Sequence, residues 1–313
     1  EVKYTPVRVS TIKANNAITF DLHLLYKDTY IMYKKSGEAL DNEKIKKLRK
    51  QKIAKFYIDS EQEKIYQAYL DRLLDNALKD PNVSTTDKAE IVSGASKNAV
   101  EEMRKNPKSK EAMAATTKAS KGIVDVVKGN PGMLKEMYNV ESDDDVILRS
   151  SVNSSALAVR MAHLKGMDET IINHISTACL LRDIGIVGMD QKFHALFAIP
   201  LEKYTPIELK IYKTHPELGK KILEERGDVP KEIINLVYYH EVKLQGNGFP
   251  KELDKLTPQQ AVISLCSAYD RLVTCLGIKP KQAMQQLAVD ELGNFELEDI
   301  SFLKKMLKDD GLI

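Results

Sequence analysis

Apolar residues follow two different spacings along the chain, and each spacing predicts a different kind of structure. In the first 80 residues, short runs alternate apolar and polar positions or are rich in β-branched and aromatic residues, and helix-like segments interrupt them. Ser60 with Glu63 three residues later is typical of a helix start. We predict strands at 7–12, 17–20, 30–33 and 53–58 and helices at 43–52 and 60–78, which together form a small α/β domain.

After residue 143 the apolar positions recur every three to four residues, which predicts helices throughout. We expect these helices at 144–166, 169–182, 205–226, 230–243, 257–276, 279–290 and 297–309. Residues 84–142 are also expected to be helical and to pack with them. The predicted fold class is therefore α+β, a small N-terminal α/β domain followed by an all-α helical bundle.

A polar linker containing a proline, residues 80–84, marks the predicted domain boundary. The first domain then covers 1–80 and has the character of a regulatory module, and the helical domain covers 84–313. Within the helical domain, we assign 84–142 to leading helices, 143–290 to the core and 291–313 to a C-terminal helix.

Composition and charge exclude some classes of partner. The net charge is +2, with 47 basic and 45 acidic residues, so no overall field favours nucleic acid. No run approaches the ~18 apolar residues that a membrane span needs, and the start does not have the pattern of a signal peptide. We therefore expect a cytoplasmic protein with no membrane insertion and no nucleic-acid partner.

One stretch of the helical domain carries unusual charge. Leu180 and Leu181 are followed by Arg182 and Asp183 at a predicted helix end. Burying a charge is costly unless it is paired or bound to a metal. The two residues therefore form either an internal ion pair or part of a metal site.

Five separated segments resemble, in order and spacing, the motifs of one family. They read Leu-Arg-Ser-Ser-Val-Asn at 148–153, Leu-Leu-Arg-Asp-Ile-Gly-Ile-Val at 180–187, Thr-Pro-Ile-Glu and His-Pro-Glu-Leu-Gly within 205–219, His-Glu-Val-Lys-Leu-Gln-Gly-Asn-Gly-Phe-Pro at 240–250, and Ser-Ala-Tyr-Asp-Arg-Leu at 267–272. The family patterns are Tyr-Arg-His-Ser-Val-Asn, Leu-Leu-His-Asp-Ile-Gly-Lys-Val, Thr-x-x-Glu with His-Pro-x-x-Gly, His-His-Glu-Lys-x-Asp-Gly-Ser-Gly-Tyr-Pro, and Asp-x-Tyr-Asp-Ala-Leu. Over residues 84–290 the chain is thus similar to the HD-GYP family, a branch of the HD-domain metal-dependent phosphohydrolases.

The resemblance implies an all-α domain that binds Fe or Mn ions and hydrolyses the bacterial second messenger cyclic di-GMP. In such chemistry a metal-activated water attacks the phosphodiester, and the metals neutralise the developing charge. Position by position, however, ligands of one metal are replaced by Ser150, Arg182 and Ser267. The neighbouring metal would be held by Asp183, His215, His240 and Glu241.

These replacements predict that the first metal position is lost. An arginine cannot deprotonate to become a ligand, so Arg182 would bring a permanent cation into that space and pair with Asp183. The second position keeps two histidines and two carboxylates, a set suited to one Fe, Mn or Zn ion. The alternative is that Asp183 pairs with Arg182 and binds no metal, while His215 and His240 are core residues with backbone partners.

Other differences concern ligand binding. The family's basic segment after Asp-Ala-Leu is less charged here, and we consider Lys243, Lys279 and Lys281 as phosphate contacts. The tight loop of Gly246, Asn247, Gly248, Phe249 and Pro250 is kept, with glycines that permit positive φ. A loop kept without the full ligand set suggests a surface for a ligand or partner.

Two functions remain open. In the first, the chain is a degenerate HD-GYP protein in bacterial signalling, without phosphodiesterase activity, that acts as a regulator or scaffold through a protein partner or by binding cyclic di-GMP. In the second, it is a residual metal-dependent phosphodiesterase acting on cyclic di-GMP or a related phosphoester, with Asp183 in the catalytic centre. The first needs no cofactor and the second needs one divalent metal.

Overall fold

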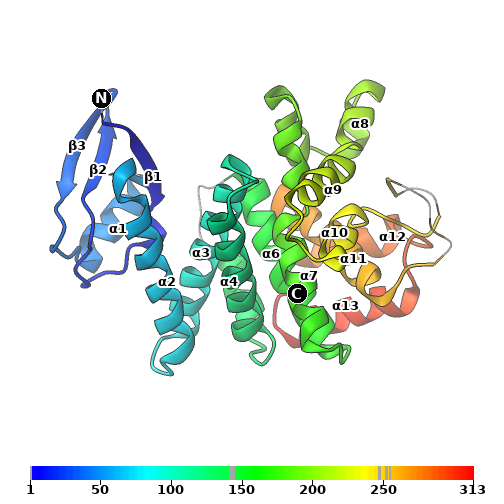
Figure 1. The fold of residues 1–313 in the computed structure, drawn as a ribbon. Coiled ribbons are helices and arrows are strands. Elements are labelled where there is room, and N and C mark those ends of the chain that lie inside the picture. Colours follow the sequence, from blue (N-terminus) through cyan, green and yellow to red (C-terminus); the bar gives the residue numbers. More distant parts are fainter. Residues whose placement is uncertain (1, 141–144, 246–247, 251–252, 254) are drawn as a thin grey trace. The chain divides into compact units, whose positions relative to one another are not determined.

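A computed structural model describes residues 2–140, 145–245, 248–250, 253 and 255–313 (Figure 1). The chain divides into two compact units, residues 1–95 with 140–144, and residues 96–139 with 145–313. The division falls inside one continuous helix, α3 (Thr85–Lys105). The predicted boundary at 80–84 lies between the end of α2 (Glu63–Lys79) and the start of α3, and it stays a prediction about independently folding domains.

The N-terminal unit contains a four-stranded antiparallel sheet in the order β1-β4-β2-β3. Its strands are β1 (Tyr4–Arg8), β2 (Leu22–Tyr26), β3 (Thr29–Lys34) and β4 (Lys55–Asp59), with α1 (Asn42–Lys50) between β3 and β4 and α2 after β4. Phe20, Phe56 and Ile58 are buried in its core beside Tyr66 and Tyr69 of α2. The alternating apolar residues thus give one buried sheet face.

Three details of this unit differ from the sequence predictions. The first strand covers Tyr4–Arg8, and Val9–Thr11 forms a 3-10 turn. The strand predicted at 7–12 was therefore placed too late in the sequence. Residues 17–20 form no strand, and β2 begins at Leu22. Ser60 does not cap α2, because its hydroxyl bonds to Thr5 on β1 at 2.9 Å. Tertiary contact with β1 outcompetes the local capping box.

The described part of the second unit is almost entirely helical (Figure 1). Its elements are the C-terminal part of α3, α4 (Lys110–Val127), α5 (Met133–Asn139), α6 (Val146–Leu164), α7 (Glu169–Leu181), α8 (Pro206–Tyr212), α9 (His215–Arg226), α10 (Lys231–Tyr238), α11 (Pro258–Asp270), α12 (Pro280–Asp290) and α13 (Leu297–Asp309). The sequence predicted a small domain of strands and helices followed by a helical region, and the structure has this order of elements. The strands of the small domain form an antiparallel sheet.

Two predicted helices end earlier than expected for local reasons. Residues 205–226 form two helices, α8 and α9, because Pro216 has no N–H to continue α8 and stands in the first turn of α9. The segment 257–276 is α-helical only to Asp270, and Arg271–Cys275 forms a turn of π-helix. This π-turn follows directly on Asp270, in the motif that contains the ligand position Ser267.

Helix α7 is the most apolar helix of the bundle. The stretch Glu169–Gly188 is long and apolar enough to cross a membrane by composition, but 72% of the tested window is buried inside the protein. The helix packs against α4, α6 and α10. Its hydropathy is therefore that of a core helix.

Candidate metal centre

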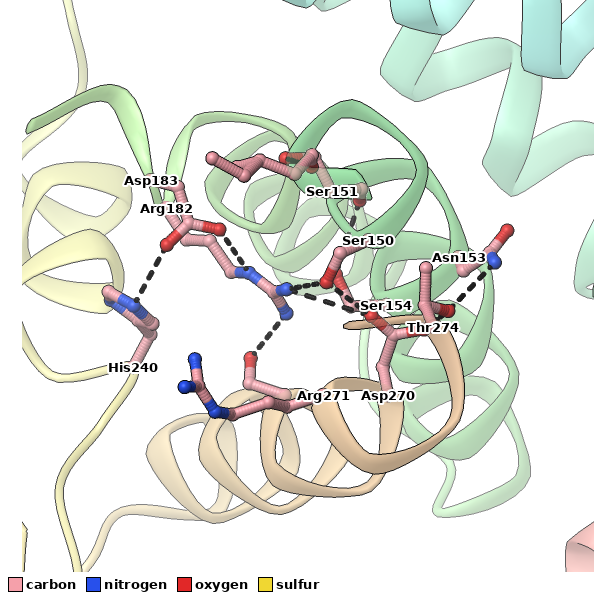
Figure 2. A network of polar contacts seen from close by, with 12 residues as sticks. Ser150, Ser151, Asn153, Ser154, Arg182, Asp183, His240, Asp270, Arg271 and Thr274 are labelled. Atoms are coloured by element: carbon pink, nitrogen blue, oxygen red, sulfur yellow. Dashed lines mark hydrogen bonds and ion pairs between the residues drawn. The ribbon is translucent and has the colours of Figure 1, made fainter. Parts of the chain in front are cut away.

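The centre of the helical unit is built from the ends and faces of three helices. Ser150 lies on α6, Arg182 follows the last residue of α7, and Ser267 and Asp270 lie on the last turns of α11. All four residues are buried. Figure 2 shows Arg182 extending from α7 into the space between Ser150, Asp270 and Asp183. The sequence motifs that are far apart in the chain therefore meet at one point.

Arg182 is held on all sides by oxygen atoms. Its Nε donates to Asp183 Oδ2 at 3.0 Å, and its Nη1 donates to Ser267 Oγ at 2.9 Å. Its Nη2 donates to Ser150 Oγ and lies 3.7 Å from Asp270 Oδ2. The pairing of Arg182 with Asp183 is the one expected from the sequence. The guanidinium also contacts both serines that stand at family ligand positions.

Asp270 is the residue of this centre that sequence reasoning missed. Its side chain is completely buried and accepts hydrogen bonds from Ser150, from Tyr138 at 3.0 Å and from Thr274 at 2.7 Å. It thereby gives Arg182 a second carboxylate. Asp270 is part of the Tyr-Asp pair in the last motif. That motif was compared with the family only to find lost metal ligands, so the aspartate was not recognised as a counter-charge for Arg182.

The charges of this half of the centre support one another. Burial lowers the pKa of the Arg182 guanidinium, but Asp183 and Asp270 outweigh it and hold the pKa above its ordinary value. Burial raises the pKa of Asp183, but Arg182 and the contact with His240 bring it well below its usual range. For Asp270 burial prevails over Arg182 and the hydroxyl donors, and its pKa is raised. The Arg182–Asp183 pair is therefore ionised.

The other half of the centre brings Asp183 together with two histidines. Asp183 Oδ1 lies 3.6 Å from His215 Nε2 and 3.7 Å from His240 Nε2, and the two Nε2 atoms are 3.0 Å apart. Asp183 thus divides its oxygens, because Oδ2 accepts from Arg182 and Oδ1 faces the imidazoles. Gly185 permits this approach, since a Cβ at that residue would lie 1.9 Å from the carbonyl oxygen of His215.

The arrangement of the two imidazoles fits a bound cation. His215 Nδ1 lies 2.7 Å from the carbonyl oxygen of Tyr212, and His240 Nδ1 lies 2.7 Å from that of Val237. Each Nδ1 therefore donates its proton to a carbonyl oxygen, and each Nε2 faces the same point as Asp183 Oδ1. Burial, together with His240, lowers the pKa of His215 to about 4, which keeps its ring neutral at pH 7. Two imidazole nitrogens and a carboxylate oxygen that converge in this way are the donor set of a divalent metal.

Glu241, the fourth predicted ligand, lies outside this cluster of converging ligand atoms. Its Oε1 accepts a hydrogen bond of 2.9 Å from the buried hydroxyl of Tyr212. Tyr212 in turn accepts from Arg271 Nη1 at 2.8 Å. Burial raises the pKa of Glu241, but His240, His215 and Arg271 bring it below its ordinary value. The structure thus assembles three of the four predicted ligands and engages the fourth with a tyrosine.

The cavity at the centre is small. Its volume is about 20 Å³, and its walls include Arg182, Asp183, Tyr212, Glu241 and Arg271. A cavity needs at least about 10–15 Å³ on this measure to hold one water molecule. The space therefore has room for a single water and not for a nucleotide.

The loop after His240 packs against the centre. Gly248 is required there, because a Cβ would lie 2.3 Å from Lys243 N. Phe249 is buried, with its ring centroid 5.8 Å from that of Tyr212 and 5.9 Å from that of His215. Pro250 follows it. Gly246 and Asn247 lie outside the described residues, so the role of this loop as a surface for a partner stays a prediction.

The three lysines considered as phosphate contacts do not converge on the cavity lining. Lys243 Nζ forms an ion pair of 2.6 Å with Glu291. Lys279 and Lys281 are exposed around the start of α12, and Lys279 lines a separate groove with Lys135. A phosphate contact by any of them stays a prediction.

Comparisons with known proteins agree with this geometry. The profile of the family described as HD domain matches residues 133–293. The sequence is 21% identical over 167 residues to the cyclic di-GMP phosphodiesterase PA4108 of Pseudomonas aeruginosa, covering 51% of this chain and 39% of that protein. It is 24% identical over 145 residues to a cyclic di-GMP phosphodiesterase of Thermotoga maritima, covering 45% of this chain and 37% of that protein.

A solved structure matches nearly the whole chain. Bd1817, an HDG"Y"P protein from Bdellovibrio bacteriovorus, is 26% identical, with a TM-score of 0.82 over 98% of this chain and 100% of that one. The protein therefore belongs to the HD-domain family, as a member of its HD-GYP branch. The two matched phosphodiesterases share well under half of their own length with this chain.

Proposed function

We propose that this protein is a signalling regulator built on the HD-GYP fold that does not hydrolyse cyclic di-GMP. One observation carries the proposal: the Arg182 guanidinium bonds simultaneously to Ser150, Ser267 and Asp183. In the motif alignment, these positions surround one metal of the family. A dication beside this fixed cation would be repelled by roughly 8 kcal/mol at ~4 Å and an effective dielectric of 20. The hydrolytic pair of metals is therefore reduced to one position at most.

The residues that would hold a remaining metal are Asp183, His215 and His240. A divalent metal in such a site supplies Lewis acidity and an activated water. The protein itself orients the two imidazoles through backbone carbonyls and keeps Asp183 ionised through Arg182. The one-water cavity supports a structural or sensory metal over one that contacts a dinucleotide.

As a regulator the protein would act through a protein partner, with cyclic di-GMP as an alternative ligand bound away from the small cavity. The matched relatives are named for cyclic di-GMP, which makes this nucleotide the first ligand to test. A cytoplasmic location, expected from the sequence, accompanies this proposal. Calorimetry with cyclic di-GMP on the purified protein separates the two kinds of partner.

A second candidate, a one-metal phosphodiesterase, is favoured by the convergent triad of Asp183, His215 and His240. Hydrolysis of cyclic di-GMP and pGpG is therefore measured with added Mn²⁺ or Fe²⁺, after the metal content has been determined by elemental analysis. We expect no turnover. Turnover that disappears in His240→Ala would overturn the regulator proposal in favour of this candidate.

The assignment of Arg182 has its own test in the same assay. Arg182→His alone is expected to remain inactive, because Ser150 and Ser267 still offer no metal ligands of the family type. Clear phosphodiesterase activity in this single variant would show that the map of ligand positions is wrong.

A further inference from the structure

A segment between α7 and α8 covers the histidine side of the centre. We call residues 191–204 the cover segment; it contains two short 3-10 helices, Gln191–Ala198 and Leu201–Lys203. Its Phe197 is buried, lines the small cavity, and has its ring centroid 5.1 Å from that of His215. Phe197 of this segment and Phe249 of the loop after His240 both pack against the His215 ring.

Arg271 binds the cover segment from the opposite wall. Its Nη2 donates to the carbonyl oxygen of Ile199 at 2.9 Å, to the Tyr204 hydroxyl at 3.0 Å and, with a long contact of 3.5 Å, to the carbonyl oxygen of Leu196. These acceptors lie on both sides of Phe197 in the sequence. One side chain therefore fixes the backbone that places Phe197 over His215.

The same guanidinium is tied into the centre. Nη1 donates to Tyr212 at 2.8 Å, the guanidinium carbon lies 5.0 Å from the centroid of the Tyr212 ring, and the Tyr212 hydroxyl donates to Glu241. Arg271 therefore bonds directly to the cover segment and to α8, and it reaches Glu241, the residue after His240, through Tyr212.

The position of Arg271 in the sequence is informative. It follows Asp270 in the segment Ser-Ala-Tyr-Asp-Arg-Leu, where the family pattern has Asp-x-Tyr-Asp-Ala-Leu. An alanine has no donor with which to bind the cover segment. Arg271 stands four residues after Ser267, where the family pattern has an aspartate. The chain thus gains bonds to the cover segment in the same motif in which it loses a ligand.

We propose that Arg271 holds the cover segment closed over Asp183, His215 and His240, and so restricts this cluster to single small ligands such as water. The bonding of one guanidinium to acceptors on both sides of Phe197 carries the inference. The restriction to small ligands rests on the proposed metal site, whereas the closure rests on the hydrogen bonds of Arg271 alone.

Hydrogen exchange tests the closure without any metal. Backbone amides of Ile199, Lys203 and Tyr204 are hydrogen-bonded within the segment and report its opening. In Arg271→Ala they are expected to exchange at least about tenfold faster, because charge-assisted bonds to the segment are lost. The matched control is Arg226→Ala, which removes an arginine that likewise donates to a backbone carbonyl, that of Ser109 at 3.0 Å. Acceleration in both variants alike, or in neither, would overturn the proposal.

A conservative variant covers the case in which Arg271→Ala does not fold. Arg271→Lys keeps the charge but has one nitrogen, which cannot serve Ile199, Tyr204 and Tyr212 together. An intermediate acceleration confined to 191–204 supports the proposal. Wild-type exchange rates in a folded Arg271→Lys protein would refute it.

Zinc release tests access to the cluster. The protein is loaded with Zn²⁺ alone, and a coloured chelator in excess reports the rate of release. Arg271→Ala is expected to release zinc at least about tenfold faster than wild type and Arg226→Ala, in proportion to the opening of the segment. Equal rates in all three would overturn the restriction of access. A protein that binds no zinc would refute the proposed metal site, while the exchange experiment would still decide the closure.

Discussion

The two halves of the centre satisfy buried charge in opposite ways. Around Arg182, a permanent cation of the protein is surrounded by two hydroxyls and two carboxylates. Around His215 and His240, two ring nitrogens and Asp183 Oδ1 converge, and in the described part of the chain no lysine or arginine bonds to these three atoms. Asp183 belongs to both halves, with one oxygen in each. One metal position can therefore be replaced by an arginine while the neighbouring donor set remains assembled.

The difference has a general physical reason. A guanidinium is a planar donor with a fixed charge, so it organises hydroxyl and carboxylate oxygens without help from the solvent. Imidazole nitrogens and a carboxylate oxygen 3.0–3.7 Å apart need an external cation or a proton between them. The arginine half is expected to be stable by itself, and the histidine half is expected to respond to metal and pH.

The largest effect should come from removing the cation of the first half. Arg182→Met keeps most of the side-chain length but leaves Asp183 and Asp270 buried without their counter-charge. Breaking a buried pair in this way costs about 3–5 kcal/mol. We expect the free energy of unfolding in urea to fall by this amount.

A second buried arginine provides the control. Arg160 forms two hydrogen bonds with Asp310, of 2.8 and 2.9 Å, elsewhere in the same unit. Arg160→Met should cost a similar amount without altering zinc binding, whereas Arg182→Met should alter both. An exposed ion pair contributes about 1 kcal/mol at most. If Arg182→Met lowers the free energy of unfolding by less than this, the arginine half does not depend on its buried cation.

The second effect concerns pH and belongs to the histidine half. The folded pKa of His215 is about 4, whereas the unfolded value is ordinary. The unfolded chain therefore binds more protons, and stability present at pH 7 is lost as the pH falls from about 6.5 towards 4. For the metal-free protein, the loss should be of the order of 3 kcal/mol. Denaturation in urea at pH 7 and pH 4.5 measures it, and His215→Gln should remove most of the dependence.

The third effect is the response to metal. Zinc at about 100 times its dissociation constant should stabilise the folded protein by about 2.7 kcal/mol. The midpoint of thermal unfolding is measured with and without zinc for wild type, His240→Ala and the control His174→Ala. His174 serves as the control because it lies on α7 and is not part of the cluster. Stabilisation that persists in His240→Ala would place the zinc elsewhere.

The sequence predicted the later helices well because their apolar spacing continues over many turns. The predicted 169–182 and 297–309 correspond to α7 (Glu169–Leu181) and α13 (Leu297–Asp309). The sheet was predicted less well. The run 17–20 has strand composition, but Phe20 is used in the core outside any strand. Short strands depend on their partners across the sheet, which local patterns do not contain.

The site residues that stand at family motif positions were predicted from the sequence. The residues that join the site through contacts between distant helices were missed. Resemblance indicated Asp183, His215 and His240 as neighbours, and they converge in the structure. Spacing alone could not reveal that Asp270 completes the shell of Arg182, or that Tyr212 engages Glu241, because these contacts join helices far apart in the chain. A charge argument would have found Asp270, since one buried arginine that replaces a metal needs more than one carboxylate.

The smallest effect tests whether the first half depends on each of its oxygens. Ser150→Ala removes the hydroxyl that accepts from Arg182 and donates to Asp270. Because both partners stay buried, the loss should be about 1–3 kcal/mol. Ser151→Ala is the matched control: Ser151 is equally buried on α6, but its hydroxyl bonds only to the carbonyl oxygen of Ile147 in its own helix, at 2.9 Å. That carbonyl keeps its helical geometry without the serine, so the control should lose less than Ser150→Ala in urea denaturation. Equal losses would mean that Ser150 contributes as any buried hydroxyl does, and that Arg182 is held by its carboxylates alone.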